Sequence, residues 1–249
     1  MASCFVCHLE ITDEEYREAR ILINMRGVQR HRSCRNPHKP SRRVKVLSVE
    51  EMQSMMSMVP RRYLAEAPLV DLRWGSTREL RITRDRALLA LIYHLGGRIN
   101  EILALERRHA TVDKMGRLRI SLKYSKRRDH AARDLHNIPV SSKATFRPHI
   151  DKYITLIGDN PDTRLFPITP VSAWMIVTSA WANAYPGSQV KERVSPHSGR
   201  HTRATIIAAA GGTLGELMSW LGWKSPTTAQ HYIEASGIPL ERISEVTTE

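Results

Sequence analysis

The chain has 249 residues, of which 41% are hydrophobic, so it can bury one substantial core and a small accessory one. Its formal net charge of +13 at pH 7, spread over several segments, favours binding to a polyanion such as nucleic acid over an ordinary basic surface. No apolar run approaches a membrane span and the N-terminus lacks a basic segment followed by an apolar one, so we expect a cytoplasmic protein without membrane contact.

All three cysteines lie within residues 1–43, and their odd number argues against a disulfide framework. Cys4-x-x-Cys7 is followed by His31-x-x-Cys34, and together they offer three thiolates and one imidazole. This is a complete tetrahedral set of ligands for zinc. Because four protein ligands leave no open coordination position, we expect a structural Zn²⁺ rather than a catalytic one. The pattern predicts a small zinc-binding module that needs the metal to fold.

Three further features belong to this N-terminal module. A Thr-Asp-Glu-Glu capping pattern predicts a helix over residues 12–23. His8 and His38 are alternatives to His31 as the imidazole ligand, and the competing interpretation is a set of buried or incidental cysteines without metal. Residues 35–43 form a basic linker with two prolines, which is suited either to lie along phosphates or to serve as a solvated connector.

A second domain is expected over residues 44–249. Ser48 and Glu51 have capping-box spacing at its start, and the methionines that follow at helical spacing indicate a core-facing helix. Residues 61–84 are polar and irregular, and they lead to another helix expected over residues 84–95.

Two glycines, Gly96 and Gly97, end that helix. They place Arg98 at the opening of the next one, where its guanidinium and free backbone amides can converge on a phosphate. Glu101, one turn later, can orient a neighbouring cationic side chain. The alternative is an ordinary surface ion pair between Arg98 and Glu101.

The pattern changes to alternating strand residues over residues 111–140. One strand is expected over residues 118–122, and residues 137–140 are expected to form the end of a later strand, with a basic segment between the two. Helices are expected over residues 146–156 and 171–184.

Residues 195–232 hold the densest group of reactive side chains. His197 and Arg200 are three residues apart, so on a helix they share one face, where a guanidinium can hold two phosphate oxygens beside an imidazole. A Leu-Gly-Trp sequence ends a second apolar helix at Trp223, and Tyr232 follows nine positions later. Tyr232 would supply a nucleophile to such a phosphate site.

At these residues the chain resembles the tyrosine recombinase (phage integrase) family. The family's second motif reads His-x-x-Arg-His, then Leu-Gly-His or Leu-Gly-Trp, then a tyrosine nine residues later, and this chain has HSGRH, LGW and Tyr232. The family's first motif supplies an arginine that matches Arg98. The resemblance covers the second domain and not residues 1–43. It implies an α+β fold that is mostly helical, with a small three-stranded antiparallel sheet.

The resemblance also implies an activity, site-specific DNA recombination or integration by a phage or mobile element. Tyr232 would attack a phosphodiester to form a 3′-phosphotyrosyl link, which conserves the bond so that no high-energy cofactor is needed. Arg98 and Arg200 would hold the non-bridging oxygens in the transition state. The resemblance also implies that no metal would take part in this chemistry.

Three further roles follow from the same resemblance. Lys123, with Lys126 as the alternative, would protonate the leaving 5′ oxygen. His197 would act as a base near the tyrosine, and Trp223 would donate its indole N–H or pack the phosphate pocket.

The implied partner is double-stranded DNA, bound by a homotetramer on paired sites, in the cytoplasm of a bacterial host if a phage or mobile element encodes the chain. Two other interpretations stay open. One is a type IB topoisomerase-like enzyme or telomere resolvase, and the other is a catalytically inactive, basic DNA-binding or architectural protein.

Overall fold

The protein is analysed as a computed structural model, which describes residues 21–23, 29–31, 45–60, 77–123, 135–188 and 194–235. Contacts divide the chain into two units, Met1–Arg43 and Val44–Glu249, and each is considered by itself.

The described part of the first unit is an antiparallel pair of strands, β1 (Ile21–Ile23) and β2 (Gln29–His31), with Ile21 opposite His31. The helix predicted over residues 12–23 is therefore wrong at its last three residues. Two of these are isoleucines, whose branched Cβ atoms favour a strand over a helix. The remainder of that predicted helix lies outside the described residues.

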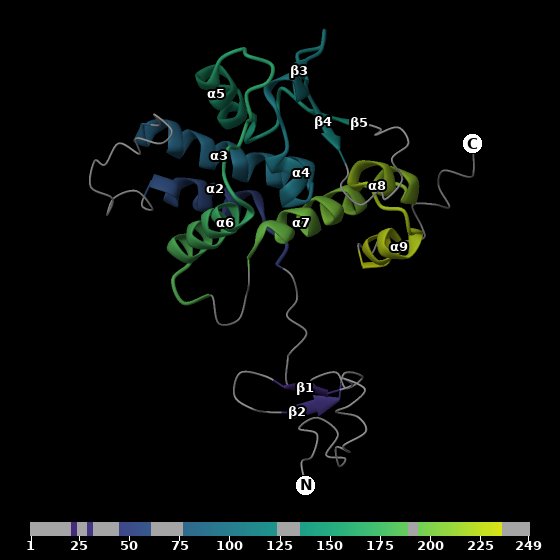
Figure 1. The fold of residues 1–249 in the computed structure, drawn as a ribbon. Helices are drawn as coiled ribbons and strands as arrows, with labels where there is room; N and C mark the ends of the chain where they lie inside the picture. The colour runs from purple at the N-terminus through teal and green to yellow at the C-terminus, as the bar shows by residue number, and fades with distance from the viewer. Residues whose placement is uncertain are drawn as a thin grey trace, which may run out of the picture. The chain divides into compact units, whose positions relative to one another are not determined.

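The second unit is mostly helical, with one small sheet (Figure 1). The sheet has the order β3-β4-β5, and both pairings are antiparallel. The predicted α+β fold class is therefore confirmed. The helices and strands are α2 (Val49–Met58), α3 (Arg78–Leu95), α4 (Ile99–Leu103), the 3₁₀ helix η2 (Arg107–His109), β3 (Ala110–Val112), β4 (Leu118–Lys123), β5 (Leu135–Val140), α5 (Arg147–Ile157), α6 (Pro170–Ala184), α7 (Pro196–Ala209), α8 (Leu214–Leu221) and α9 (Pro226–Ala235).

The capping box at the start of α2 is present as predicted. The Ser48 hydroxyl accepts a hydrogen bond from the Glu51 amide at 3.1 Å, and the Ser48 amide donates to the Glu51 carboxylate at 2.9 Å. Met52, Met55 and Met56 are buried, which confirms the core-facing side of this helix. The capping box thus satisfies two backbone N–H groups at the start of the helix, which would otherwise be hydrogen-bonded only to water.

Helix α3 is the central element of the second unit, and it begins six residues earlier than predicted. Thr77 caps it by accepting a hydrogen bond from the Leu80 amide at 3.2 Å. The first turns are rich in arginine and carry little apolar periodicity, so the hydrophobic pattern indicated only the helix from residue 84 onward. In Figure 1, α3 crosses the unit with α5 and the sheet on one side and α6 and α7 on the other.

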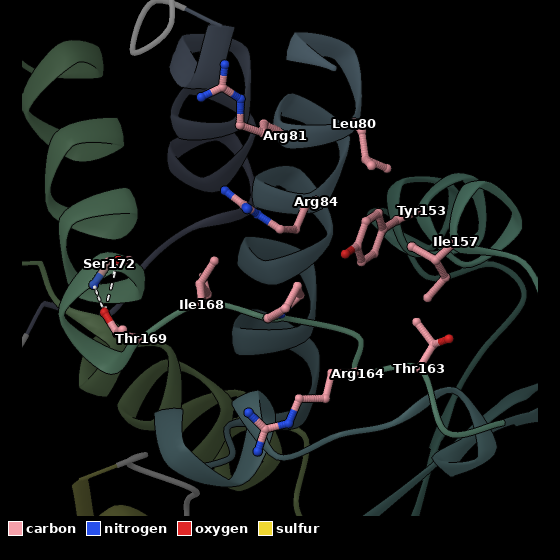
Figure 2. A pocket seen from close by; sticks show the side chains of 11 residues that line it. Leu80, Arg81, Arg84, Tyr153, Ile157, Thr163, Arg164, Ile168, Thr169 and Ser172 are labelled. Carbon is pink, nitrogen blue, oxygen red and sulfur yellow. Dashed lines mark hydrogen bonds between the residues drawn. The ribbon is translucent and has the colours of Figure 1, made fainter. Parts of the chain in front are cut away.

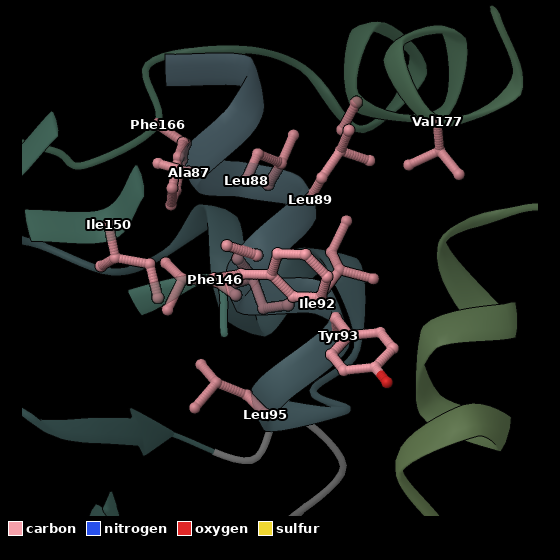
Figure 3. Packing of buried hydrophobic residues seen from close by; sticks show 14 of the residues in the cluster. Ala87, Leu88, Leu89, Ile92, Tyr93, Leu95, Phe146, Ile150, Phe166 and Val177 are labelled. Atoms are coloured by element: carbon pink, nitrogen blue, oxygen red, sulfur yellow. The ribbon is translucent and has the colours of Figure 1, made fainter. Parts of the chain in front are cut away.

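The core surrounds the second half of α3. Residues 87–95 are all buried, so this part of the helix has no face exposed to solvent. Figure 3 shows Leu88 and Ile92 of this helix beside aromatic and aliphatic side chains of other elements, including Phe146 and Phe166. This packing fixes the C-terminal end of α3, from which the first motif continues.

The sheet buries one face. Leu118, Ile120 and Leu122 alternate with less buried residues along β4, as expected for a strand with one face on the core. Ile120 lies opposite Ile138 of β5, and Lys123 lies opposite Leu135 at the end of the ladder. Among the described helices, none combines the length and apolar character needed to cross a bilayer.

Candidate active site

Helix α7 carries the second motif and lies directly against α3. A hydrogen bond from the Ser195 amide to the Ser198 hydroxyl, 3.1 Å long, and Pro196 in the first turn start this helix. Gly199 allows the close approach, because a Cβ atom there would lie 2.3 Å from Cγ2 of Ile92 and 2.9 Å from its carbonyl oxygen. The missing side chain therefore lets the motif reach the end of α3.

Arg200 is buried at that junction, with 3% of its surface exposed. Its Nη1 atom donates to the carbonyl oxygen of Gly96 at 3.0 Å, and its Nη2 atom donates to the carbonyl oxygen of Leu221 at 2.5 Å. These carbonyls end α3 and α8, where the helix dipoles favour a cation. Arg200 thus holds two helix ends together and is fixed in orientation by them.

Arg98 caps the next helix from the other side of the glycine pair. Its amide donates to Oε2 of Glu101 and its Nη1 atom donates to Oε1, both at 2.8 Å. The Glu101 side chain is fully buried, whereas that of Arg98 is 29% exposed. The pair is therefore not an ordinary surface ion pair. A buried carboxylate holds the guanidinium at the protein surface.

Tyr232 reaches this region from α9, which packs on α7 and α8 through Ala208, Leu217 and Ala229. Its hydroxyl forms a short hydrogen bond with Nδ1 of His201. The predicted nucleophile therefore lies beside the second motif of the same chain.

Trp223 lies against both Tyr232 and Arg200. Its ring stacks on that of Tyr232, with centroids 5.3 Å apart and planes 22° apart, and the guanidinium carbon of Arg200 lies 5.4 Å from its ring. The Trp223 ring thus packs against the Tyr232 phenol and lies near the Arg200 guanidinium.

His197 is exposed and contacts His201 edge to face, with ring centroids 4.7 Å apart. The pKa of His197 is lowered by partial burial and by the charges of Arg200 and Arg98. Both predicted arginines therefore act electrostatically on one imidazole. His197 and the two arginines are brought to one place, although no hydrogen bond links His197 to Tyr232 among the contacts of the described residues.

Burial favours the neutral forms of both Tyr232 and His201. Burial, then the charges of His197 and Arg200, lower the pKa of His201 to about 4. Burial raises the pKa of Tyr232 above its usual value, against the opposing charge of Arg200. At neutral pH a neutral phenol therefore meets a neutral imidazole.

The sequence motifs assigned no role to His201. A signal was available, because His197 and His201 are four residues apart and so share one face of α7. The i, i+4 spacing identifies the face but not the contact with Tyr232, which depends on how α9 packs.

Lys123 is exposed at the end of β4, next to the first motif. The preceding residue, Leu122, packs beside the glycine pair: a Cβ atom at Gly97 would lie 3.3 Å from Cδ1 of Leu122. The strand thus passes close to the residue before Arg98. Lys126, the alternative lysine, lies outside the described residues.

A separate hollow of about 790 Å³ lies between α3, α5 and the start of α6 (Figure 2). Arg81 and Arg84 of α3, Tyr153 of α5 and Arg164 contribute to its lining. None of the residues that line it is one of the predicted site residues, so the candidate active site is a different place on the second unit.

The predicted zinc ligands Cys4, Cys7 and Cys34 lie outside the described residues, and His31 is the last residue of β2. Within the described residues, no group of three or more His, Cys, Asp and Glu side chains is placed to hold a metal ion. The zinc module stays a prediction.

The second unit has the fold of known recombinases. Its structure is similar to that of XerH site-specific recombinase bound to palindromic difH substrate in a post-cleavage complex, with a TM-score of 0.56 and 18% sequence identity over 82% of this chain and 54% of that one. At this identity the likeness concerns the fold.

Sequence comparisons place the chain in a family. It is 27% identical to tyrosine recombinase XerD of Corynebacterium glutamicum, over 79% of this chain and 59% of that protein. It is 30% identical to tyrosine recombinase XerC of Methylobacterium nodulans, over 68% of this chain and 51% of that protein. The chain thus spans between half and three fifths of the length of these relatives. The phage integrase family model matches residues 45–237. The chain therefore belongs to the phage integrase family of tyrosine recombinases.

Proposed function

We propose that the chain is a site-specific DNA recombinase that cleaves and rejoins strands through a 3′-phosphotyrosyl intermediate. The observation that carries the proposal is the Tyr232 hydroxyl, which lies in one cluster with Trp223, His201 and the buried Arg200. A tyrosine at that place can attack a phosphate held by Arg200 and Arg98. The tyrosine recombinases XerC and XerD, and the XerH site-specific recombinase bound to its difH substrate, support DNA as the substrate.

The proposed step balances without an external energy source. The Tyr232 hydroxyl gives up its proton to a neighbouring imidazole and its oxygen forms a bond to phosphorus, while the bond between phosphorus and the 5′ oxygen breaks. Arg98 and Arg200 stabilise the charge on the non-bridging oxygens, because both are fixed by hydrogen bonds before the substrate arrives. Lys123 gives a proton to the leaving 5′ oxygen. A 5′ hydroxyl then reverses the step and rejoins a strand.

His197 and Trp223 complete the proposed site. His197 is exposed and neutral at pH 7, so it can donate a hydrogen bond to the phosphate. Trp223 packs against the phenol and lies near Arg200, which supports a packing role rather than proton transfer.

The test uses nicked suicide DNA duplexes that carry candidate sites from the sequence flanking the gene. The wild-type chain and a Tyr232→Phe variant are incubated with each duplex without added metal and run on a denaturing gel. We expect a covalent protein–DNA band that the variant does not form. Binding by gel shift without such a band would favour an inactive DNA-binding protein.

Strand exchange distinguishes the remaining enzyme alternative. Adduct formation together with recombination between two sites supports a recombinase, whereas relaxation or resolution without exchange supports a topoisomerase-like enzyme. We also propose a homotetramer on paired sites. Light scattering of the protein with and without two-site DNA tests this, and a particle with one or two protomers per DNA pair would contradict it.

We also propose that residues 1–43 bind one structural zinc ion through Cys4, Cys7, His31 and Cys34. The donor set supports this, since three thiolates and an imidazole are typical of closed tetrahedral sites. Metal content of the purified full chain should be one zinc per protein, and Cys34→Ser should lower it. Equal zinc content in the variant would contradict the assignment.

A further inference from the structure

We propose that His201 accepts the proton of the Tyr232 hydroxyl when the phenol attacks the phosphodiester. This inference rests on the proposed function and adds a residue to which the sequence patterns assigned no role. It reassigns the base from His197, which the resemblance implied, to the imidazole one turn later on the same helix.

His201 contacts the Tyr232 phenol in the free chain. The Nδ1 atom of His201 is the atom that forms a hydrogen bond with the Tyr232 hydroxyl, and the two ring centroids are 5.6 Å apart. Trp223 stacks on the same phenol, so the phenol contacts both an aromatic ring and an imidazole. A proton acceptor must be within hydrogen-bond reach of the proton that it takes, and His201 satisfies this condition in the free chain.

The direction of this hydrogen bond follows from the neutral state of both rings. Because the imidazole of His201 is neutral at pH 7, one of its ring nitrogens is an acceptor. The phenol of Tyr232 is also neutral and is a better donor than acceptor, so its hydroxyl donates to Nδ1 and the ring proton lies on Nε2. The acceptor position faces the nucleophile before DNA binds.

The proton and the bonds can be followed atom by atom. The Tyr232 oxygen forms a bond to phosphorus, its O–H bond breaks, and the proton moves to Nδ1 of His201. The bond between phosphorus and the 5′ oxygen breaks, and that oxygen takes a proton from Lys123. In the rejoining step a 5′ hydroxyl attacks, and His201 returns its proton to the leaving phenol.

The substrate itself makes His201 a better base. The charged and titratable groups around it are His197 and Arg200 on its own helix and Tyr232 on α9. Of these, Arg200 carries a permanent positive charge, which disfavours a second cation on the imidazole. A phosphodiester bound by Arg98 and Arg200 brings a negative charge that opposes this effect. The imidazole therefore gains proton affinity when DNA occupies the site.

The experiment compares the rate of covalent adduct formation in His201→Asn and His201→Ala with the wild type, at saturating suicide DNA. Asn places an amide oxygen near the position of Nδ1, so it keeps a hydrogen-bond acceptor but cannot take a proton. We expect a rate about 10²-fold lower in both variants, with DNA affinity unchanged in gel shifts. Added imidazole should restore part of the rate in His201→Ala, which loss of a merely structural contact would not allow.

His231→Asn is the matched control, because His231 is exposed and adjacent to Tyr232 in the sequence. Its adduct rate should equal that of the wild type. A His201→Asn rate within about threefold of the wild type would overturn the inference while leaving the proposed function intact. A wild type that forms no adduct would instead remove the proposed function.

A second measurement needs no DNA. Nitrogen-15 NMR of histidine-labelled free protein should show His201 at pH 7 as the neutral tautomer with its proton on Nε2. A proton on Nδ1 would overturn the inference, because that nitrogen could not then accept the Tyr232 proton.

Discussion

The guanidinium of Arg200 donates a hydrogen bond to the carbonyl oxygen of Gly96, 3.0 Å away, across 104 positions of the sequence. This bond joins the two sequence motifs directly. A second bond from Arg200 to Leu221 connects the helix that precedes Trp223 to the same point. One buried side chain therefore sets the relative position of the groups that are proposed to hold the phosphate.

Replacing the Arg200 guanidinium should reduce the stability of the fold as well as the proposed activity. In Arg200→Lys a single ammonium replaces two directed donors, and one of the carbonyls of Gly96 and Leu221 loses its partner inside the protein. We expect the free energy of unfolding in urea to fall by about 2 kcal/mol and adduct formation to be lost. Arg98→Lys is the comparison, since Arg98 is partly exposed and a lysine can still pair with Glu101. Arg98→Lys should lower the free energy of unfolding by less than about 1 kcal/mol. An equal loss of stability in the two variants would contradict the structural role of Arg200.

The turn between α3 and α4 should not accept a side chain at its first glycine. Gly96 has a φ of 62°, and a Cβ atom there would lie 2.8 Å from Cβ of Arg203 and 2.9 Å from Cδ2 of Leu221. Gly96→Ala should therefore lower the free energy of unfolding by about 3 kcal/mol, from backbone strain and crowding together. Gly116→Ala is a matched control with a φ of 72° and no atom within 4 Å, so only the backbone effect of about 1 kcal/mol applies. Equal melting temperatures for the two variants would refute this.

Acid should destabilise the fold through His94. Burial, then the charge of Arg203, lower the pKa of His94 from 6.5 to about 4, and its Nε2 atom is buried without a hydrogen-bond partner among the described residues. Between these pH values the unfolded chain binds a proton that the folded chain does not, so stability falls as pH falls from 6.5 to about 4. The difference in pKa between the two states corresponds to roughly 3 kcal/mol in the free energy of unfolding from His94. Below about pH 4 both states are protonated and its contribution no longer changes.

The measurement is the free energy of unfolding at several pH values in wild type and His94→Leu. The leucine variant should show a shallower loss between pH 6.5 and 4, because the group that titrates differently in the two states is absent. His231→Gln, at an exposed position, should keep the wild-type slope. A slope in His94→Leu as steep as in the wild type would show that other groups account for the pH dependence.

The ring of Trp223 should matter more to the proposed activity than its indole N–H. Trp223→Phe keeps an aromatic surface against Tyr232, so its adduct rate should stay within about threefold of wild type. Trp223→Ala removes that surface, and we expect a rate at least about tenfold lower, since aromatic pairs contribute about 1 kcal/mol and the phenol also loses its fixed position. Trp174→Ala, at a tryptophan of α6 that is 45% exposed, is the control. If Phe were as damaging as Ala, the indole N–H would be the group that matters.

Local signals in the sequence determined much of the second unit. The cap at Ser48, the proline in the first turn of α7, the glycines that end α3 and the alternation along β4 each depend on residues close in the chain. The order and spacing of Arg98, His197, Arg200, Trp223 and Tyr232 resemble the two motifs of the family, and this resemblance predicted the family and a common site. The start of α3 was missed because its first turns depend on a cap at Thr77 rather than on apolar periodicity.

Only the tertiary structure decided which groups touch. The hydroxyl of Tyr232 meets His201 and not His197 because α9 packs on α7 and α8 through Ala208, Leu217 and Ala229. That packing leaves no periodic mark in the sequence. The partners of Arg200 are likewise backbone carbonyls of two helix ends, which no residue pattern encodes. Spacing along a helix fixes which side chains share a face, whereas their distances to groups on other helices depend on how closely the helices pack, as at Gly199.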